Sequence, residues 1–188
     1  RMKDGTHITD FRYESHKIIS GKEKLVGYGQ TYADKEDVET LVITLKDTLY
    51  NLYLDLSYSV FNNYPILTRH SVIRNESEDT IYIEKLSSCN IDFRNENLEL
   101  IHLSGAWGNE RELTRQSIEK GNFIIDSKRG SSSHHHNPFI ALVDKGTNET
   151  SGNAYALNLV YSGDFSSEIE KDSKGNIRTN MGLNPFTF

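Results

Sequence analysis

The chain has 188 residues, which is enough for one folded unit that buries a sizeable core. Lys and Arg number 21 against 27 Asp and Glu, and the resulting formal charge of −6 argues against nucleic acid as a partner. The single cysteine, Cys89, excludes an intramolecular disulfide, and no apolar run approaches the roughly 18 residues that a membrane span requires.

Residues 1–10 lack the apolar region of a signal peptide, and a lone cysteine is typical of a protein made in a reducing compartment. We therefore expect a soluble, cytoplasmic protein without a membrane partner. The sequence begins in a polar segment with no N-terminal element of its own, so we interpret it as part of a longer protein.

Alternation of apolar and polar residues with period 2, the pattern of strands with one buried face, recurs through most of the chain. It predicts five early strands that are separated by polar turns, in the order of an antiparallel meander: 39–45, 52–60, 67–75, 80–93 and 98–103. In the second of these strands five residues are expected to share one face: Leu52, Leu54, Leu56, Tyr58 and Val60.

Later strands are expected at 121–127, 138–144, 154–164, 168–171 and 176–183, and the turn at 172–175 joins the last two as a hairpin. The one helical candidate is 109–119, where a turn of helix or an irregular loop fits equally well. Many short strands without intervening helices predict an all-β fold, an antiparallel β-sandwich.

The polar segment 128–139 contains three consecutive histidines, which invite the interpretation of a metal site. Neighbouring side chains of an extended segment point to opposite faces, so only His134 and His136 could converge on one ion. No carboxylate or cysteine lies nearby in the sequence to complete the ligand set. The alternatives are an expression tag, a loop that presents polar groups to a ligand or a neighbouring domain, and a plain surface loop, which the spacing alone favours.

Trp107, the only tryptophan, stands in a glycine-flanked segment after an expected strand. Such a residue can stack on a sugar or anchor an interface, but more often it packs at the edge of a core. The carboxylate runs at 34–37 and 76–79 are expected to be solvated turns. Because there is no phosphate-binding glycine loop, nucleophile elbow or His-Glu-x-x-His helix, we expect no self-sufficient active site, no metal and no cofactor in this chain.

Five segments, in one order along the chain, resemble motifs of the N-terminal domain of bacterial glycoside hydrolase family 36 α-galactosidases. They are Gly-Thr-His-Ile-Thr-Asp-Phe-Arg-Tyr-Glu-Ser-His at 5–16, Ser-Gly-Ala-Trp at 104–107 with Glu-Arg at 110–111, Arg-Gly-Ser-Ser-Ser-His-His-His-Asn-Pro-Phe at 129–139, Asn-Leu-Val-Tyr-Ser-Gly-Asp-Phe at 158–165 and Gly-Leu-Asn-Pro-Phe at 182–186. The match covers essentially the whole chain and identifies the histidines as native sequence. Lys128 and Asp164 depart from the family pattern, and His135 fills a variable place, which leaves the fine substrate preference open.

The resemblance implies a β-supersandwich of the galactose mutarotase-like type at 1–188, with the first strands of the domain, the catalytic (β/α)₈ barrel and a C-terminal β domain all outside this chain. It implies retaining hydrolysis of terminal α-galactosides such as melibiose and raffinose by two barrel aspartates, so no catalytic residue is expected here.

The resemblance further implies three kinds of partner: the catalytic barrel, α-galactoside sugars through the full-length enzyme, and other subunits of a homo-oligomer, a tetramer in the parent. The candidates for contact with the barrel, a neighbouring subunit or the sugar are Trp107, Arg129, His134, His136 and Asn137. Two alternatives remain: a free-standing carbohydrate-binding or structural β-sandwich, and an enzyme that transfers galactose instead of hydrolysing the bond.

Overall fold

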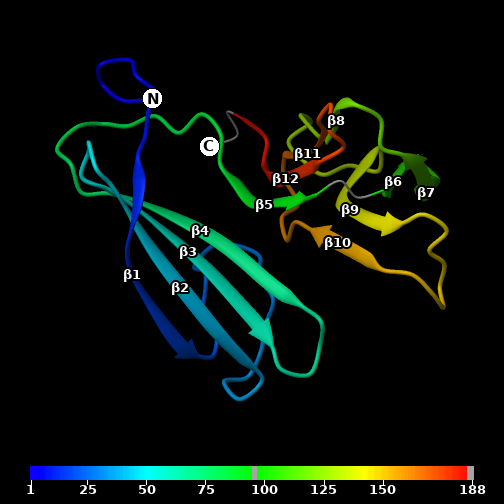
Figure 1. Ribbon diagram of the computed structural model, residues 1–188, viewed down its shortest axis with the longest axis horizontal. Helices are drawn as coiled ribbons and strands as arrows, with labels where there is room; N and C mark the ends of the chain where they lie inside the picture. The colour runs from blue at the N-terminus through cyan, green and yellow to red at the C-terminus, as the bar shows by residue number, and fades with distance from the viewer. Residues whose placement is uncertain (95–96, 186–188) are drawn as a thin grey trace. The chain divides into compact units, whose positions relative to one another are not determined.

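The computed structural model describes residues 1–94 and 97–185, and all its regular elements in these ranges are strands, β1 to β12 (Figure 1). Strand contacts divide the chain into two compact units, Arg1–Glu84 and Lys85–Phe188, a subdivision that the sequence pattern does not anticipate. The predicted all-β, antiparallel β-sandwich class is confirmed. No helix in the described ranges is long and apolar enough to cross a membrane. Asn95 and Glu96 of an expected turn, and Phe186 of the last motif, lie outside the described residues.

The first unit is one four-stranded antiparallel sheet in the order β1-β2-β3-β4. Its strands are β1 (Phe11–Ser20), β2 (Val38–Asp47), β3 (Leu52–Phe61) and β4 (Leu67–Asn75). The last three form the expected meander. The alternation does not reveal β1, because this edge strand is mostly exposed and a bulge shifts its register between Tyr13 and Ser15.

The two faces of β3 are buried to different degrees. Leu52 is buried and Val60 is exposed on the face that the alternation assigns to the apolar residues. On the opposite face Ser57 and Ser59 are 3% and 1% exposed, because the long β1–β2 connection covers that side and Thr40 of β2 hydrogen-bonds both Ser59 and Gly21. The polar face of this strand is therefore the better buried one.

The second unit contains two four-stranded antiparallel sheets, β10-β9-β6-β7 and β5-β12-β11-β8. The strands of the first are β6 (Leu98–Ala106), β7 (Asn109–Ser117), β9 (His136–Asp144) and β10 (Ala154–Asn158). Those of the second are β5 (Ser87–Phe93), β8 (Gly121–Asp126), β11 (Phe165–Lys171) and β12 (Ile177–Leu183). One apolar core joins both sheets and includes Leu100, Ile140 and Leu142 from the first and Phe165 and Ile169 from the second.

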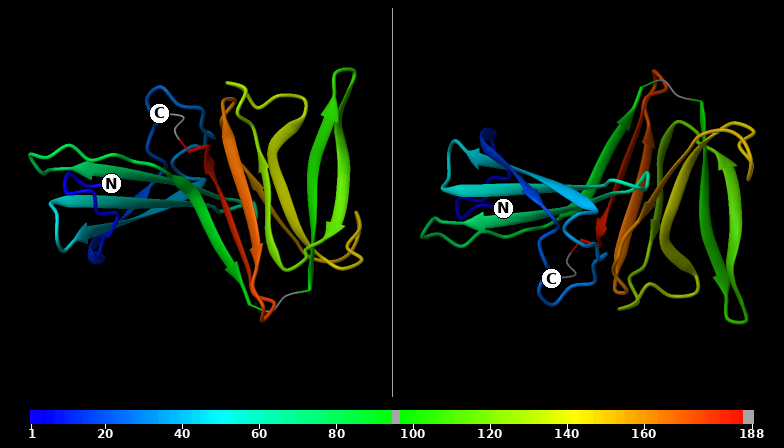
Figure 2. Two further views of the ribbon diagram at one scale, coloured as in Figure 1. Left: turned by 90° about the horizontal axis from the view of Figure 1, so that it is seen from above. Right: turned by 90° about the horizontal axis from the view of Figure 1, so that it is seen from below.

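The β11–β12 hairpin is confirmed, and the two strands lie side by side in Figure 2, orange to red. The Asp172 carboxylate closes its turn by accepting hydrogen bonds from the backbone N–H groups of Lys174 and Asn176, at 2.8 and 2.9 Å. The turn chemistry of the sequence therefore set the correct pairing at this place.

Several expectations are wrong in detail, and one is the strand expected at 80–93, of which only Ser87–Phe93 is a strand, β5. The helical candidate 109–119 is strand β7, which pairs with β6, so tertiary pairing overrides the lack of an alternating apolar pattern. The meander ends at β4, because β5 pairs with β12 and β6 lies in the other sheet of the second unit. The strand expected at 154–164 ends at Asn158.

Candidate functional site

The candidate site is built from three connections of the second unit that meet at the β8–β9 loop, residues 127–135. The backbone N–H of Ser132 donates to the carbonyl of Ser162 at 2.8 Å, and the N–H of Gly130 donates to the Asp164 carboxylate at 2.7 Å. On the other side the N–H of Gly105, in the β6–β7 hairpin, donates to the carbonyl of His135 at 3.3 Å. The second, third and fourth sequence motifs therefore lie together in space, and we call this group of loops the motif end.

Asn184, from the fifth motif, fastens the base of the motif end. Its side chain is 4% exposed, and its amide donates to the carbonyl of Ser127 at 3.0 Å and to that of Phe165 at 3.3 Å. Its backbone N–H donates to the carbonyl of Asp164 at 3.3 Å. A side chain with two amide hydrogens can satisfy two buried carbonyls at once, which explains an asparagine at this position.

The β6–β7 hairpin presents Trp107 at its tip. Ala106 pairs with Asn109, so Trp107 and Gly108 form the turn, and Gly108 has a φ of 79°. A Cβ on Gly105 would lie 2.3 Å from the carbonyl oxygen of Asn109. Only glycine therefore fits at this β-bulge, where the backbones of β6 and β7 approach each other closely. Trp107 is 87% exposed, which rules out the interpretation that it packs at the edge of a core in this chain.

The three histidines occupy different environments. The rings of His134 and His135 lie with their centroids 4.2 Å apart. Partial burial, and next the charge of Arg129, lower the pKa of His135. His136 begins β9, and its Nδ1 is buried without a hydrogen-bond partner among the described residues.

His102 of β6 is a buried histidine that the sequence did not single out. It is 7% exposed, its ring lies 5.8 Å from that of Phe123, and its Nδ1 has no hydrogen-bond partner in the part of the chain that the structure describes. Burial, and next the charge of His136, lower the pKa of His102. The sequence did contain a signal for this. His102 follows Leu98 and Leu100 at a spacing of two residues, so the alternation of a strand places it on the same core-facing side.

A hollow of about 470 Å³ lies beside the motif end, on the outer face of the β8-β11-β12 sheet. Asp126, Asp164 and Glu168 line it, and Lys85 pairs with Glu168 at 2.6 Å. Lys128 pairs with Asp126 at 3.3 Å, so most of the acidic charge is offset locally.

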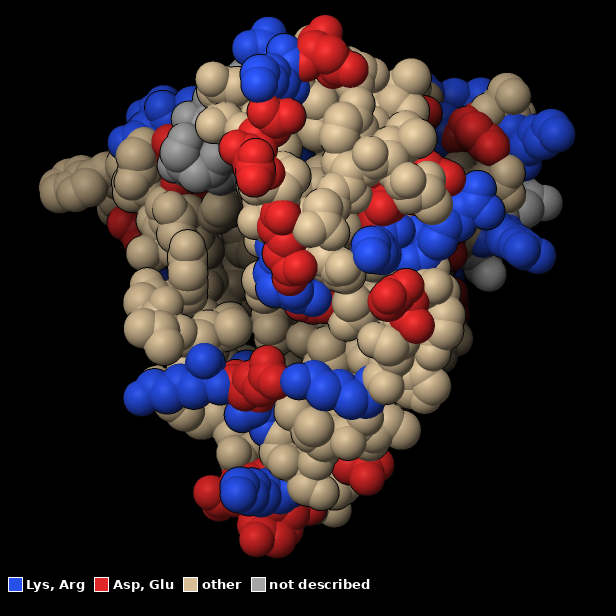
Figure 3. Space-filling view, turned by 90° about the vertical axis from the view of Figure 1, so that its left-hand side faces the viewer, with Lys and Arg blue, Asp and Glu red and all other residues tan. Residues whose placement is uncertain are grey.

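The charged side chains do not gather by sign on the side of the molecule drawn in Figure 3. There, basic and acidic side chains are interspersed among uncharged ones.

The structure places the five predicted contact residues in one region. Trp107 and Arg129 are exposed, whereas His134, His136 and Asn137 are half-buried. Sequence reasoning missed the structural roles of Gly105 and Asn184 in this region, and it did not single out the buried His102. Within residues 1–94 and 97–185, no group of three or more His, Cys, Asp or Glu side chains is arranged to hold a metal ion. The motif end thus offers exposed contact groups on a braced scaffold.

Comparison with known proteins gives one consistent result. The sequence matches the family described as "Glycosyl hydrolase family 36 N-terminal domain" over residues 1–188. It is 42% identical to "Probable alpha-galactosidase C" of Aspergillus flavus, over 98% of this chain and 25% of the relative. Against "Alpha-galactosidase AgaA" of Geobacillus stearothermophilus the identity is 39%, over 100% of this chain and 26% of the relative.

Solved structures agree with the sequence comparison. The crystal structure of AgaA superposes with a TM-score of 0.97, and that of an α-galactosidase from Lactobacillus brevis, 34% identical, with a TM-score of 0.96. Each match covers 100% of this chain and 25–26% of the other. The chain therefore spans about a quarter of the length of these relatives. AgaA variants have been solved in complex with raffinose and with stachyose.

Proposed function

Because this chain belongs to the glycoside hydrolase family 36 N-terminal domain family, we propose that its parent protein is an α-galactosidase and that this domain is a non-catalytic part of it. The observation that carries the proposal is the match over the whole chain to enzymes of that activity, at 39–42% identity. The AgaA complexes with raffinose and stachyose support α-galactosides of that series as substrates of the parent.

Within such an enzyme the motif end is proposed to form the contact with the catalytic barrel, a neighbouring subunit or the sugar. A rigid aromatic side chain that protrudes from a short hairpin is a common anchor of protein and sugar contacts, and Trp107 has this arrangement. The neighbouring candidates Arg129, His134, His136 and Asn137 add hydrogen-bonding groups around it. Assembly of the parent into a homo-oligomer, with this domain at the subunit contacts, belongs to the same proposal.

The proposal is tested by measuring hydrolysis of a chromogenic α-galactoside with the isolated chain and with the full-length parent, prepared side by side. We expect activity in the parent only. Hydrolysis by the isolated chain would refute the non-catalytic role and direct attention to its own carboxylates. A parent without activity on melibiose, raffinose and the chromogenic substrate would refute the assignment of an α-galactosidase.

A further inference from the structure

His102 stands at one end of the apolar core, on the inner side of β6. It alternates with Leu100, a member of the core, and it lies directly opposite Thr114 of β7 and Ile140 of β9. Residues that lie opposite each other share one face of a sheet, so His102 points into the space between the two sheets. There its ring lies 5.8 Å from that of Phe123 of β8. Both layers of the sandwich therefore enclose His102.

The start of β9 brings a second imidazole to the same face. Ser104 follows His102 by two residues and lies opposite His136, so the two histidines share one side of the sheet. The register shifts between His102 and Ser104, and this bulge leaves the first residues of β9 outside the continuous pairing that begins at Ile140. The start of β9 is thus held to β6 less firmly than the rest of the strand.

His102 lacks the partner that a charged imidazole requires. It is 7% exposed, and the Nδ1 atoms of His102 and His136 are both buried without a hydrogen-bond partner in the part of the chain that the structure describes. A protonated ring donates from both nitrogens, so each needs an acceptor. β7 and β8 face His102 with the uncharged Thr114 and Phe123, whereas β9 brings His136. Burial and the charge of His136 both lower the pKa of His102, and among the described residues no carboxylate raises it.

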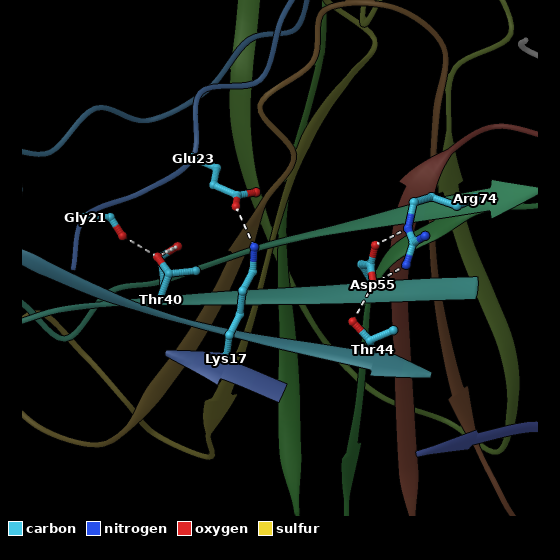
Figure 4. A network of polar contacts seen from close by, with 8 residues as sticks. Lys17, Gly21, Glu23, Thr40, Thr44, Asp55 and Arg74 are labelled. Atoms are coloured by element: carbon cyan, nitrogen blue, oxygen red, sulfur yellow. Dashed lines mark hydrogen bonds and ion pairs between the residues drawn. The ribbon is translucent and has the colours of Figure 1, made fainter. Parts of the chain in front are cut away.

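Asp55 shows how the same chain keeps the charge of a half-buried side chain. Its carboxylate accepts a hydrogen bond from the Thr44 hydroxyl at 2.7 Å and pairs with Arg74 at 2.8 Å (Figure 4). His102 is more deeply buried and has neither kind of contact within the described ranges. A charge on His102 therefore has to be met by water, which reaches the ring only when a neighbouring segment moves.

The β8–β9 loop is the neighbour of His102 that moves at the lowest cost. β6 and the later part of β9 contribute to the apolar core, whereas residues 128–135 are exposed or half-buried. The loop is fastened by single backbone hydrogen bonds. The N–H of Gly105 donates to the carbonyl of His135 at 3.3 Å, and the N–H of Ser132 donates to a carbonyl of the β10–β11 connection at 2.8 Å. Opening the loop breaks these bonds without exposing the core.

We propose that His102 is an acid-sensitive latch, whose protonation releases the β8–β9 loop and the start of β9 while the two sheets stay folded. In the open form water reaches the ring, which then regains its ordinary pKa of 6.5, whereas the pKa is lower in the closed form. The open population therefore rises as the pH falls below 6.5, by up to about tenfold per pH unit, until the pH reaches the pKa of the closed form. At neutral pH the loop stays closed.

The latch goes beyond the proposed function and does not depend on it. The β8–β9 loop carries Arg129 and His134, two of the contact candidates, so the latch makes their placement depend on pH. Every measurement that tests the latch is made on the 188-residue chain itself, and none of them uses a sugar substrate.

Amide hydrogen exchange, measured by NMR and corrected for the intrinsic exchange rate, tests the proposal between about pH 7.5 and about pH 5.5. The protection factors of the Gly105 and Ser132 amides should fall roughly fivefold to tenfold over this range. Gly175 is the control, because its N–H closes the β11–β12 turn on the Asp172 carbonyl at 3.2 Å, far from any histidine in sequence. Constant protection of Gly105 and Ser132 would overturn the latch, and so would an equal loss at Gly175, which would mean that the whole unit loosens.

Two variants assign the pH dependence to a residue. His102→Gln keeps a polar side chain that cannot be protonated, and it should make the protection of Ser132 independent of pH over the same range. His134→Gln is the matched control, because it removes a histidine from the loop itself and should leave the pH dependence intact. The latch is refuted when the dependence persists in His102→Gln or disappears in His134→Gln.

An NMR titration of the wild-type His102 ring needs no variant, and it decides the question even when His102→Gln does not fold. The ring should titrate below pH 6.5 in the folded chain, and the loss of protection should level off near that midpoint. A ring that titrates at or above 6.5 would remove the driving force for opening and overturn the proposal.

Discussion

Replacing Asn184 with alanine should loosen the motif end, because this side chain links three segments that are distant in sequence. The substitution removes the amide donors to the carbonyls of Ser127 and Phe165, at 3.0 and 3.3 Å, in a place where the asparagine is only 4% exposed. The Phe165 carbonyl keeps the backbone N–H of Ser127 as a donor at 3.0 Å, so only the Ser127 carbonyl loses its donor, which costs on the order of 1 kcal/mol or more. We therefore expect the free energy of unfolding to fall by about 1–2 kcal/mol, since water can reach the vacated space only in part.

Urea denaturation of the isolated chain, followed by circular dichroism, measures this change. Asn122→Ala is the matched control, because Asn122 is exposed on β8 and a substitution there should stay within about 0.5 kcal/mol. Asn184→Asp separates size from hydrogen bonding, since it keeps the volume but replaces the donating amide with a carboxylate close to Asp126. An effect of Asn184→Ala no larger than that of the control would refute the view that this residue braces the loop.

The remaining predictions concern the hairpin and the buried histidine. Gly105→Ala should destabilise the chain by about 1–3 kcal/mol in urea denaturation, because the new Cβ would lie 2.3 Å from the Asn109 carbonyl oxygen; an unchanged midpoint would contradict the close crossing. Trp107→Ala should change the unfolding free energy by less than about 0.5 kcal/mol, but it should lower kcat/KM of the parent roughly tenfold. Tyr64 is an exposed aromatic residue in the first unit, and the control variant Tyr64→Ala should leave kcat/KM unchanged. Burial holds the pKa of His102 below its usual 6.5, so the unfolded chain binds more protons as pH falls and stability should drop from about pH 7.5 to about pH 5.5. His102→Gln should reduce that drop in urea titrations at both pH values, and an equal drop in the variant would assign it to other groups such as His70, whose pKa burial also lowers.

The sequence by itself determined the class of fold and most strand positions. Alternation is a local property of a strand with one buried face, so the predicted 67–75 coincides with β4, and 52–60 differs from β3 by one residue at its end. The turn at Asp172 fixed the last hairpin, because an aspartate that closes a tight turn acts only on its neighbours. The order of five motifs was enough to select Trp107, Arg129 and the histidine loop as one group.

Only the tertiary structure decided which strands pair and which faces are covered. The polar sequence of β7 gives no strand signal, and it is a strand because β6 supplies its hydrogen-bond partners. Likewise Ser57 and Ser59 are buried although the alternation places the leucines of β3 inside, since a connection from elsewhere in the chain covers the serines. Pairing and burial depend on residues far away along the chain, and for that reason neither the bracing by Asn184 nor the burial of the serines in β3 could be derived from local patterns.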